Sequence, residues 1–533
     1  MKLINNNISQ SEKENALNKL INEILERRMQ PEDKYEIAAI LESMGWNDSM
    51  ASEAFGTDDI FALSADIWDI IQEKILFMPA APVKKIDFMQ YSIMIIRSFL
   101  RGTIFALPMA VSVASMLTLR FSLWSYEYLS LENATSIAIG TILSFMAVGG
   151  FTQAIARRGF MYLGQGHYYL ARRISFYFVK SGFIVCLITS ALFFLLNAIF
   201  LVYPWRMVII VILYFIFLCA IWLSVTIMYM LQKELTFTGL ILGGILVVFI
   251  FFKLANVNII LSQIISLALV SLAGVAIAYY YFMRAERGAE KGIAPPMPRL
   301  SIVAYTSIPY FAYGFLYFTF LFADRVIAWS TNNIYMPYLI WFRGEYELGL
   351  DLAIITFILP MGVVEVVVNE IMTNLEANQK NFMAANVRQM NRNYIILYIK
   401  RIIFVILFSV ANAVMIYFSI KILNQNGTLE TNIIANKMIR FVFIYAVIAY
   451  TVIVVALMNN MILFSLSQPE VVYRSTLYAL LINVFLGFVL SRWVDYTWAV
   501  FGLLIGAIAF AIITSRRVWE LFNNLDYYLY SAM

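Results

Sequence analysis

Twelve runs of apolar residues divide most of this sequence, and each is long enough to cross a lipid bilayer, which takes about 20 residues of helix. The runs lie at 99–119, 134–155, 181–203, 207–231, 238–256, 259–283, 302–324, 348–374, 402–423, 440–466, 471–491 and 497–514. Charged residues make up only 13% of the 533 residues, whereas a soluble domain is about 25% charged. The sequence therefore predicts an all-α polytopic membrane protein with about twelve transmembrane helices.

The charge is unevenly distributed along the chain. Residues 1–83 hold 15 Asp and Glu against 7 Lys and Arg, whereas the rest of the chain holds 18 against 31. No apolar signal segment opens the sequence. This division predicts an acidic cytoplasmic domain at 1–83, the head, followed by a basic membrane body. Anionic lipid and nucleic acid repel an acidic surface, so we interpret the head as a docking module for a protein and expect no nucleic-acid partner.

Helical periodicity predicts three helices in the head. Ser11 and Glu14 have the spacing of a capping box for the first helix, Pro31 suits the start of the second, and the third begins near Thr57. The apolar residues at helical spacing are Leu17, Leu20, Ile21, Ile24, Leu25, Ile37, Ile40, Leu41, Met44, Ile60, Leu63, Ile67 and Ile71. A chain of this length can form its own core, and a fraying amphipathic extension is the alternative.

The twelve runs also predict an orientation in the membrane. An even number of spans places both termini on one side, and a head without an export signal places that side in the cytoplasm. In this layout the cytoplasmic side beyond the head holds 22 Lys and Arg, against 9 on the opposite side. Cytoplasmic loops carry such an excess. We therefore expect a multi-pass plasma-membrane protein with both termini in the cytoplasm.

Similar features recur in the two halves of the body. Long basic connections follow the second and the eighth run, and the first and seventh runs each carry one proline near the middle, Pro108 and Pro309. Two further pairs match at one shared offset, Arg173 with Arg388 and Asn197 with Asn412. These features predict a parallel repeat of two six-helix lobes, an N-lobe at 84–298 and a C-lobe at 299–533. Proline-broken helices at matching places are typical of transporters, so both prolines are hinge candidates.

Polar and ionisable side chains inside a membrane are costly and mark functional sites. The candidates for a transport path are Glu365, Glu370, Asp324, Arg325 and Asn459. Glu365 is the strongest candidate, because it falls well inside the eighth run. Other interpretations stay open for the rest. Glu370 fits a solvated helix end, Asp324 and Arg325 fit an interfacial ion pair at the outer end of the seventh run, and Asn459 fits a hydrogen bond between helices.

The basic connection at 156–180 predicts contacts with phosphate groups. Its candidates for cytoplasmic phosphate or lipid contacts are Arg157, Arg158, Arg172 and Arg173, because arginines on this side attract anionic lipid. A role on a pyrophosphate-linked sugar is the alternative. His167 is the only histidine, and Cys186 and Cys219 both fall in apolar runs. We therefore expect no metal site, no disulfide framework and no cofactor.

Sequence motifs give no support for an enzyme. The membrane body has no D-x-D pair, G-x-S-x-G elbow, H-E-x-x-H helix or P-loop. We therefore expect a protein that is not an enzyme and whose transport is not powered by ATP bound to this chain.

Two stretches at the ends of spans carry a resemblance to a known family. YGFLYFTFLFADRVIAWS at 313–330 and GGFTQAIARRGFMYLG at 149–164 are similar to the end of span 7 and the exit of span 2 in PelG-type exopolysaccharide exporters. These belong to the multidrug/oligosaccharidyl-lipid/polysaccharide exporter (MOP) superfamily, and the resemblance covers the chain from about residue 90.

The resemblance implies a membrane exporter that moves a polysaccharide or lipid-linked oligosaccharide. Its implied partners are a cytoplasmic glycosyltransferase, other membrane subunits of the biosynthetic system, and membrane lipid. Two alternatives remain open: a cation-coupled exporter of small amphiphiles on the same fold, and a membrane enzyme acting on lipid-linked sugars.

Overall fold

The protein consists of helices joined by turns. The computed structural model describes residues 10–27, 31, 33–77, 88–126, 128–289, 298–331, 338–379, 387–425 and 436–532. It divides into two units, one comprising Met1–Ile86 with Thr373–Asn393 and the other Asp87–Met372 with Tyr394–Met533. Among the described residues, β pairing is limited to an isolated bridge between Phe121 and Tyr126. The predicted all-α class is confirmed.

The described part of the head forms four helices, one more than predicted. They are α1 (Gln10–Arg27), α2 (Lys34–Ser43), α3 (Asp48–Phe55) and α4 (Ile60–Phe77). The N-cap of the additional helix α3 is Asn47, whose side chain accepts a hydrogen bond from the N–H of Met50 at 2.9 Å. Its C-cap is Gly56, whose φ of +76° is a conformation that glycine adopts without strain. Eight residues are too few for helical periodicity to be visible in the sequence.

Both predicted caps of the head helices are wrong. Ser11 lies inside α1 rather than at its N-cap. Helix α2 begins after Asp33, whose carboxylate accepts the N–H of Glu36 at 2.8 Å, and not at Pro31. A carboxylate close to the first free N–H groups of a helix makes a stronger cap than proline provides.

The predicted apolar residues of the head do form a core. The buried members are Leu20, Ile21, Ile24, Ile37, Leu41, Ile60, Leu63, Ile67 and Ile71, and the core also includes Ala51, which was not predicted. Leu17, Leu25, Ile40 and Met44 pack against this core and are partly buried. All of these residues belong to the head itself, so the head has the hydrophobic core of an independent domain.

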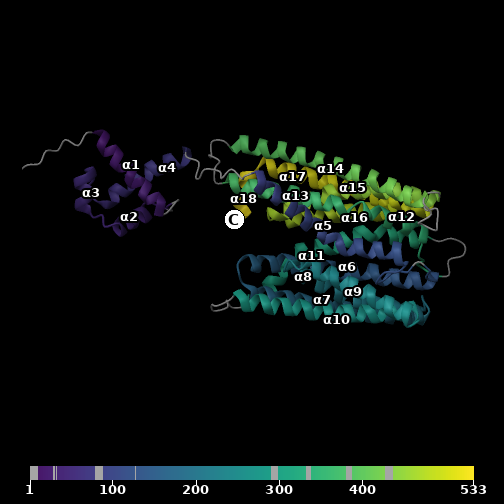
Figure 1. Cartoon of the computed structure of the whole chain (residues 1–533). Helices are drawn as coiled ribbons and strands as arrows, with labels where there is room; N and C mark the ends of the chain where they lie inside the picture. The colour runs from purple at the N-terminus through teal and green to yellow at the C-terminus, as the bar shows by residue number, and fades with distance from the viewer. Residues whose placement is uncertain are drawn as a thin grey trace, which may run out of the picture. The chain divides into compact units, whose positions relative to one another are not determined.

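The membrane body consists of long helices (Figure 1). They are α5 (Phe88–Leu119), α6 (Leu131–Gly164), α7 (Tyr168–Phe200), α8 (Trp205–Met230), α9 (Glu234–Phe249) with the π-helix η1 (Ile250–Leu254), α10 (Ile259–Ala289), α11 (Leu300–Trp329), α12 (Gly344–Ile355), α13 (Ile358–Gln379), α14 (Val387–Gln425), α15 (Lys437–Ser465), α16 (Pro469–Trp493), the 3-10 helix η3 (Tyr496–Trp498), α17 (Ala499–Asn523) and α18 (Leu525–Ala532). Within the described residues, 11 spans are long and apolar enough to cross a membrane. Helix α5 covers the remaining predicted run at 99–119.

The interruption of a span occurs at a different place from the one predicted. Pro108 and Pro309 both lie inside continuous helices, α5 and α11, so the expectation that they break their helices is wrong. The break falls in the eighth span, where α12 ends at Ile355 and α13 begins at Ile358. The role of the two prolines as hinges stays a prediction.

Most body helices gather into two groups, which Figure 1 shows as separate layers. In the first group α6 packs against α7 and α8, and α10 packs against α8 and α9. In the second group α17 packs against α15 and α16, and α12 packs against α15. We refer to α6–α10 as the N-terminal group and to α12–α17 as the C-terminal group.

Helix α11 packs against both groups. Towards its beginning Val303 and Phe311 contact the core of the N-terminal group. Towards its end Phe320 and Trp329 belong to the core of the C-terminal group, and the carbonyl of Phe320 accepts a hydrogen bond from Asn483 of α16 at 2.9 Å. Helix α11 therefore crosses from one group to the other.

Helix α5 makes the complementary crossing. Its early residue Gly102 touches Gly362 of α13, and Ser98 Oγ accepts a hydrogen bond from Asn369 of α13 at 2.9 Å. Further along, Val111 packs against the core of the N-terminal group, and α5 packs against α9. Each crossing helix thus begins against one group and ends against the other.

We expect residues 1–80 to fold without the membrane body, because their core is self-contained. The fragment should unfold cooperatively in denaturant when followed by circular dichroism. Ile67→Ala, at a fully buried position, should lower the free energy of unfolding by about 2–5 kcal/mol. Phe61→Ala, at a position that is 52% exposed, should change it by less than about 1 kcal/mol. A fragment without a cooperative transition would refute the independence of the head.

Candidate functional site

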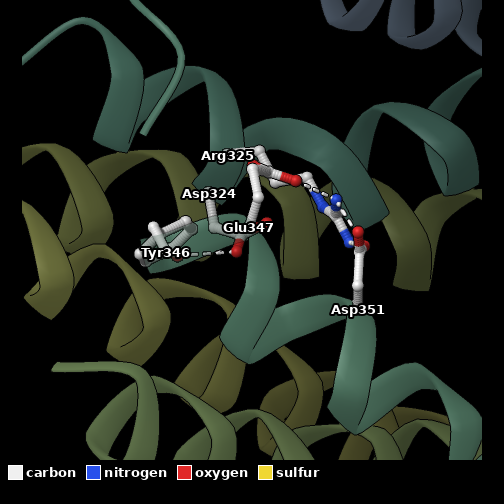
Figure 2. Close-up of polar contacts among 5 residues, drawn as sticks. All are labelled: Asp324, Arg325, Tyr346, Glu347 and Asp351. Carbon is white, nitrogen blue, oxygen red and sulfur yellow. Dashed lines mark hydrogen bonds and ion pairs between the residues drawn. The ribbon is translucent and has the colours of Figure 1, made fainter. Parts of the chain in front are cut away.

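A buried ionic cluster joins the end of α11 to α12 (Figure 2). The guanidinium of Arg325 forms an ion pair with Glu347 Oε2. Its Nη1 and Nη2 atoms also lie 3.2 Å from Asp351 Oδ1. The hydroxyl of Tyr346 donates a hydrogen bond to Asp324 Oδ2 at 2.8 Å. The two neighbouring residues of α11 therefore have different partners on α12.

Helix geometry explains this arrangement. Side chains four residues apart lie on one face of a helix, so Glu347 and Asp351 both meet the guanidinium of Arg325. Consecutive residues point about 100° apart around a helix, so Asp324 faces Tyr346 instead. The interpretation of Asp324 and Arg325 as an interfacial ion pair is therefore wrong, because each is bound to α12 and both are buried.

The cluster carries more negative than positive charge. It has three carboxyl groups and one guanidinium. Asp324 is 0% exposed, Glu347 5% and Arg325 7%, whereas the side chain of Asp351 is 62% exposed. An uncompensated charge is costly away from water. The arrangement can lower this cost by taking up a proton at its carboxyl oxygens.

The predicted residue Glu370 lies in a second polar cluster, which joins three helices. It forms an ion pair with Arg401 of α14 and accepts a hydrogen bond from the hydroxyl of Tyr91 of α5 at 3.0 Å. Glu370 is buried. The interpretation as a solvated helix end is therefore wrong.

The predicted residue Glu365 lies where α5 passes α13. A Cβ atom on Gly102 would come within 2.9 Å of the Cβ atom of Glu365, so the two backbones are in close contact there. The side chain of Glu365 is half-buried, and the positive charge of Arg101 acts on its carboxyl group. Its place at the crossing is established, and its role on a transport path stays a prediction.

The predicted residue Asn459 links three helices of the C-terminal group. It accepts a hydrogen bond from Tyr398 of α14 at 2.7 Å and donates to Thr514 and Ser515 of α17 at 3.1 and 2.9 Å. These contacts match the interpretation as a hydrogen bond between helices. A contact of Asn459 with substrate stays a prediction.

The arginines of the basic connection bind to neighbouring helices. Arg158 of α6 donates hydrogen bonds to Ser307 and Thr306 of α11, and the guanidinium of Arg157 lies 5.2 Å from the ring centre of Tyr310. Both therefore strengthen the crossing of α11 over α6.

The other two arginines act within the N-terminal group. Arg172 of α7 forms an ion pair with Glu286 of α10 at 2.8 Å, and Arg173 donates to the hydroxyl of Tyr169 at 2.9 Å. Contacts of the four arginines with lipid or substrate phosphate stay predictions.

Half-buried aromatic rings lie along the seam where the two helix groups meet. Phe145 of α6 stacks on Trp222 of α8 with ring centres 4.5 Å apart, and on Phe318 and Phe322 of α11 at 5.5 and 5.4 Å. All four side chains are partly exposed. The rings therefore form a continuous surface that joins the N-terminal group to α11.

The aromatic surface continues along α11. Phe318 contacts Tyr317, Tyr317 stacks on Tyr313 at 5.7 Å, and Tyr313 meets Phe464 of α15 at 5.0 Å. Phe464 in turn stacks on Tyr310 at 5.5 Å. We refer to these rings, from Trp222 and Phe145 to Tyr310, as the aromatic seam.

Polar contacts close the seam at the end where α6 begins. The hydroxyl of Tyr203 donates to the carbonyl of Ile340 at 3.3 Å, and the N–H of Phe342 donates to Thr135 at 3.2 Å. These contacts join the N-terminal group to the segment before α12. At the opposite end α11 meets the C-terminal group through Tyr313, which contacts Asn460 and Phe464 of α15.

Several members of these sites were not predicted from the sequence. The candidates predicted from the sequence did not include Glu347, Tyr346, Phe145 or Trp222. The predicted eighth run began at residue 348, which placed Glu347 outside the membrane. The available signal was the pair of acidic residues four apart, Glu347 and Asp351, close in sequence to a span that ends in Arg325.

Metal binding receives no support from the described residues. Among them no group of three or more His, Cys, Asp or Glu side chains is placed to hold a metal ion.

Comparison with known proteins identifies the fold. No protein-family model matches this chain, and no curated protein matches it in sequence. Solved structures do match it. The eukaryotic MATE transporter AtDTX14 is similar with a TM-score of 0.55 and 12% identity, over 84% of this chain and 100% of that one. A Vibrio cholerae MATE transporter, VcmN, is similar with a TM-score of 0.54 and 12% identity, over 82% and 97%.

A third similar structure carries the superfamily name. It is an outward-facing multidrug resistance MATE family transporter of the MOP superfamily, with a TM-score of 0.53 and 13% identity, over 80% of this chain and 96% of that one. This chain is therefore a polytopic membrane protein with the MATE fold. The expected all-α membrane fold is confirmed, and membership of the MOP superfamily and the likeness to PelG-type exporters stay predictions.

We expect the Arg325 cluster to be needed for stability. Arg325→Met keeps the aliphatic stem but leaves the buried carboxyl group of Glu347 without its ion-pair partner. It should destabilise the protein by about 3–5 kcal/mol, measured by denaturant unfolding in detergent micelles. The matched control is Arg516→Met, which removes a guanidinium whose side chain is 80% exposed and paired with Glu520; its effect should stay below about 1 kcal/mol. Equal effects of the two changes would contradict the account of the cluster.

Proposed function

We propose that this protein exports a polysaccharide or a lipid-linked oligosaccharide across the plasma membrane. The observation that carries the proposal is the aromatic seam. A transport path between two helix groups requires surfaces that separate and meet again, and the stacked rings around Phe145 in this seam are only half-buried. The MATE fold of the chain supports the general class of membrane exporter.

Ring faces suit a sugar substrate for a physical reason. One face of a pyranose ring consists of C–H groups, which pack on the electron-rich face of an aromatic ring. Sugar hydroxyls also need hydrogen-bond partners. The seam provides these at the hydroxyl groups of Tyr310 and Tyr317, whose side chains are partly exposed.

The proposal includes a membrane orientation and partners. The excess of Lys and Arg on one side of the body supports cytoplasmic termini in the plasma membrane. The acidic head, with its own core, is proposed as the docking module for a cytoplasmic glycosyltransferase and for the other membrane subunits of the system. The PelG-like stretches at 149–164 and 313–330 support this choice of partner. The transporter likeness supports a protein that is not an enzyme.

A second candidate is favoured by the Arg325 cluster. A cation-coupled exporter of small amphiphiles needs carboxyl groups that take up and release a proton or cation, and Asp324 and Glu347 are buried beside one guanidinium. The similar structures are MATE transporters, which supports this candidate as well. In both candidates Glu365, at the crossing of α5 and α13, is proposed to face the path.

We expect the aromatic seam to be needed for secretion. In cells that secrete exopolysaccharide through this protein, Phe145→Ala and Trp222→Ala should lower secreted polymer at least tenfold at matched membrane abundance, because the ring faces are lost. Trp222→Phe keeps a ring and should retain most of the secretion. Phe485→Ala, at a position of α16 that is 67% exposed, is the control and should secrete normally.

Two outcomes of this experiment count against the proposal. Normal polymer secretion by both alanine variants would refute the sugar path. Loss of resistance to amphiphilic cations in the same variants, with polymer secretion intact, would support the second candidate instead.

A further inference from the structure

A cavity of about 520 Å³ lies between α11, α16 and α17, beside the turn that joins α15 to α16. It does not belong to the aromatic seam or to the Arg325 cluster. Its lining includes Pro309, Gln468, Glu470, Arg474, Tyr478 and Arg517. Pockets that bind small molecules in proteins have volumes of about 300–1,000 Å³, so this cavity is large enough for a polar head group.

The crossing of α11 explains why the cavity exists. From Phe320 onward α11 packs in the core of the C-terminal group, whereas Phe311 and Val303 contact the core of the N-terminal group. Pro309 lies between these last two contacts and lines the cavity. The departing half of α11 therefore leaves α16 and α17 without a covering helix at this level.

The chemistry of the lining favours an anion. Two guanidinium groups, of Arg474 and Arg517, line the cavity together with one carboxylate, of Glu470. The planar guanidinium donates paired hydrogen bonds that match the oxygens of a phosphate group. The hydroxyl of Tyr478, which is 54% exposed, and the amide of Gln468 add neutral hydrogen-bonding groups.

Both guanidinium groups can exchange their present partners for a ligand. Arg474 pairs with Glu470 at 3.2 Å, with side chains that are 62% and 66% exposed. Arg517 pairs with Glu520 at 2.7 Å, and these side chains are 54% and 39% exposed. Exposed ion pairs one helical turn apart contribute little to stability. Breaking them to bind a phosphate group therefore costs little free energy.

The predicted orientation places the cavity on the cytoplasmic side, at the level of the inner lipid head groups. Basic pockets between membrane helices on this side bind phosphate-bearing lipid head groups. We propose that this cavity binds the phosphate group of a membrane-embedded lipid, with Arg474 and Arg517 as its ligands. The lipid is either an ordinary anionic phospholipid or the polyprenyl pyrophosphate carrier of a sugar, and the second source rests on the proposed function.

Native mass spectrometry of the purified full-length protein tests the site with defined lipids. The probes are phosphatidylglycerol, a polyprenyl pyrophosphate, and diacylglycerol, which has no phosphate. We expect the first, the second or both to be retained, and diacylglycerol to be lost. Arg474→Gln combined with Arg517→Gln should weaken retention at least tenfold. Arg516→Gln is the matched control, because Arg516 neighbours Arg517 but does not line the cavity, and it should bind as wild type does.

The outcomes distinguish the two lipid sources from each other and from the absence of a phosphate site. Arginine-dependent retention of phosphatidylglycerol supports an ordinary phospholipid, and arginine-dependent retention of only the pyrophosphate supports the sugar carrier. Unchanged retention of both phosphate lipids by the double variant overturns the proposal, as does equal retention of diacylglycerol. Thermal unfolding of each variant controls for misfolding. Because the assay measures binding without export, a failure of the proposed export function leaves its result valid.

Discussion

The close approach of backbones at the two helix crossings is the constraint on which the rest of the body depends. A Cβ atom on Gly314 of α11 would lie 2.1 Å from the carbonyl oxygen of Gly149 of α6, and one on Gly102 of α5 would lie 2.8 Å from the Cα atom of Gly362 of α13. Only glycine permits such contacts between helices, and small residues provide close packing in a membrane, where apolar surface alone gives no preference for protein over lipid. The crossings join the two helix groups in two complementary places.

The crossings also determine where the chemistry lies. Because α11 changes groups, its later half brings Arg325 to the acidic residues of α12, its middle brings Phe318 to Phe145, and its early half uncovers the cavity beside Pro309. The seam is held at both ends in this structure. Under the proposed export function, a substrate on the aromatic seam requires one end of the seam to separate while the other holds.

The sequence predicted best those features that depend on a single helix. Long apolar runs predicted the spans, and periodic isoleucines and leucines predicted the core of the head, because burial follows directly from pattern. Contacts between distant segments were not predictable in this way. Glu347 became part of a site only through Arg325, and Glu370 only through Arg401. The break in the eighth span falls at residues 356–357, and Pro360 follows it in the first turn of α13, whereas the prediction rested on Pro108 and Pro309.

Cross-linking the end of the seam where α6 begins tests the central claim, that the two groups separate there during the proposed transport. In a background lacking Cys186 and Cys219, cysteines at Thr135 of α6 and Phe342 before α12, which are in contact, are joined by a short bifunctional thiol reagent. The matched pair is Arg172 with Glu286, which are in contact within the N-terminal group. The account predicts that linking the first pair stops secretion until the link is reduced, and that linking the second pair does not. Full secretion with Thr135 and Phe342 linked would contradict it.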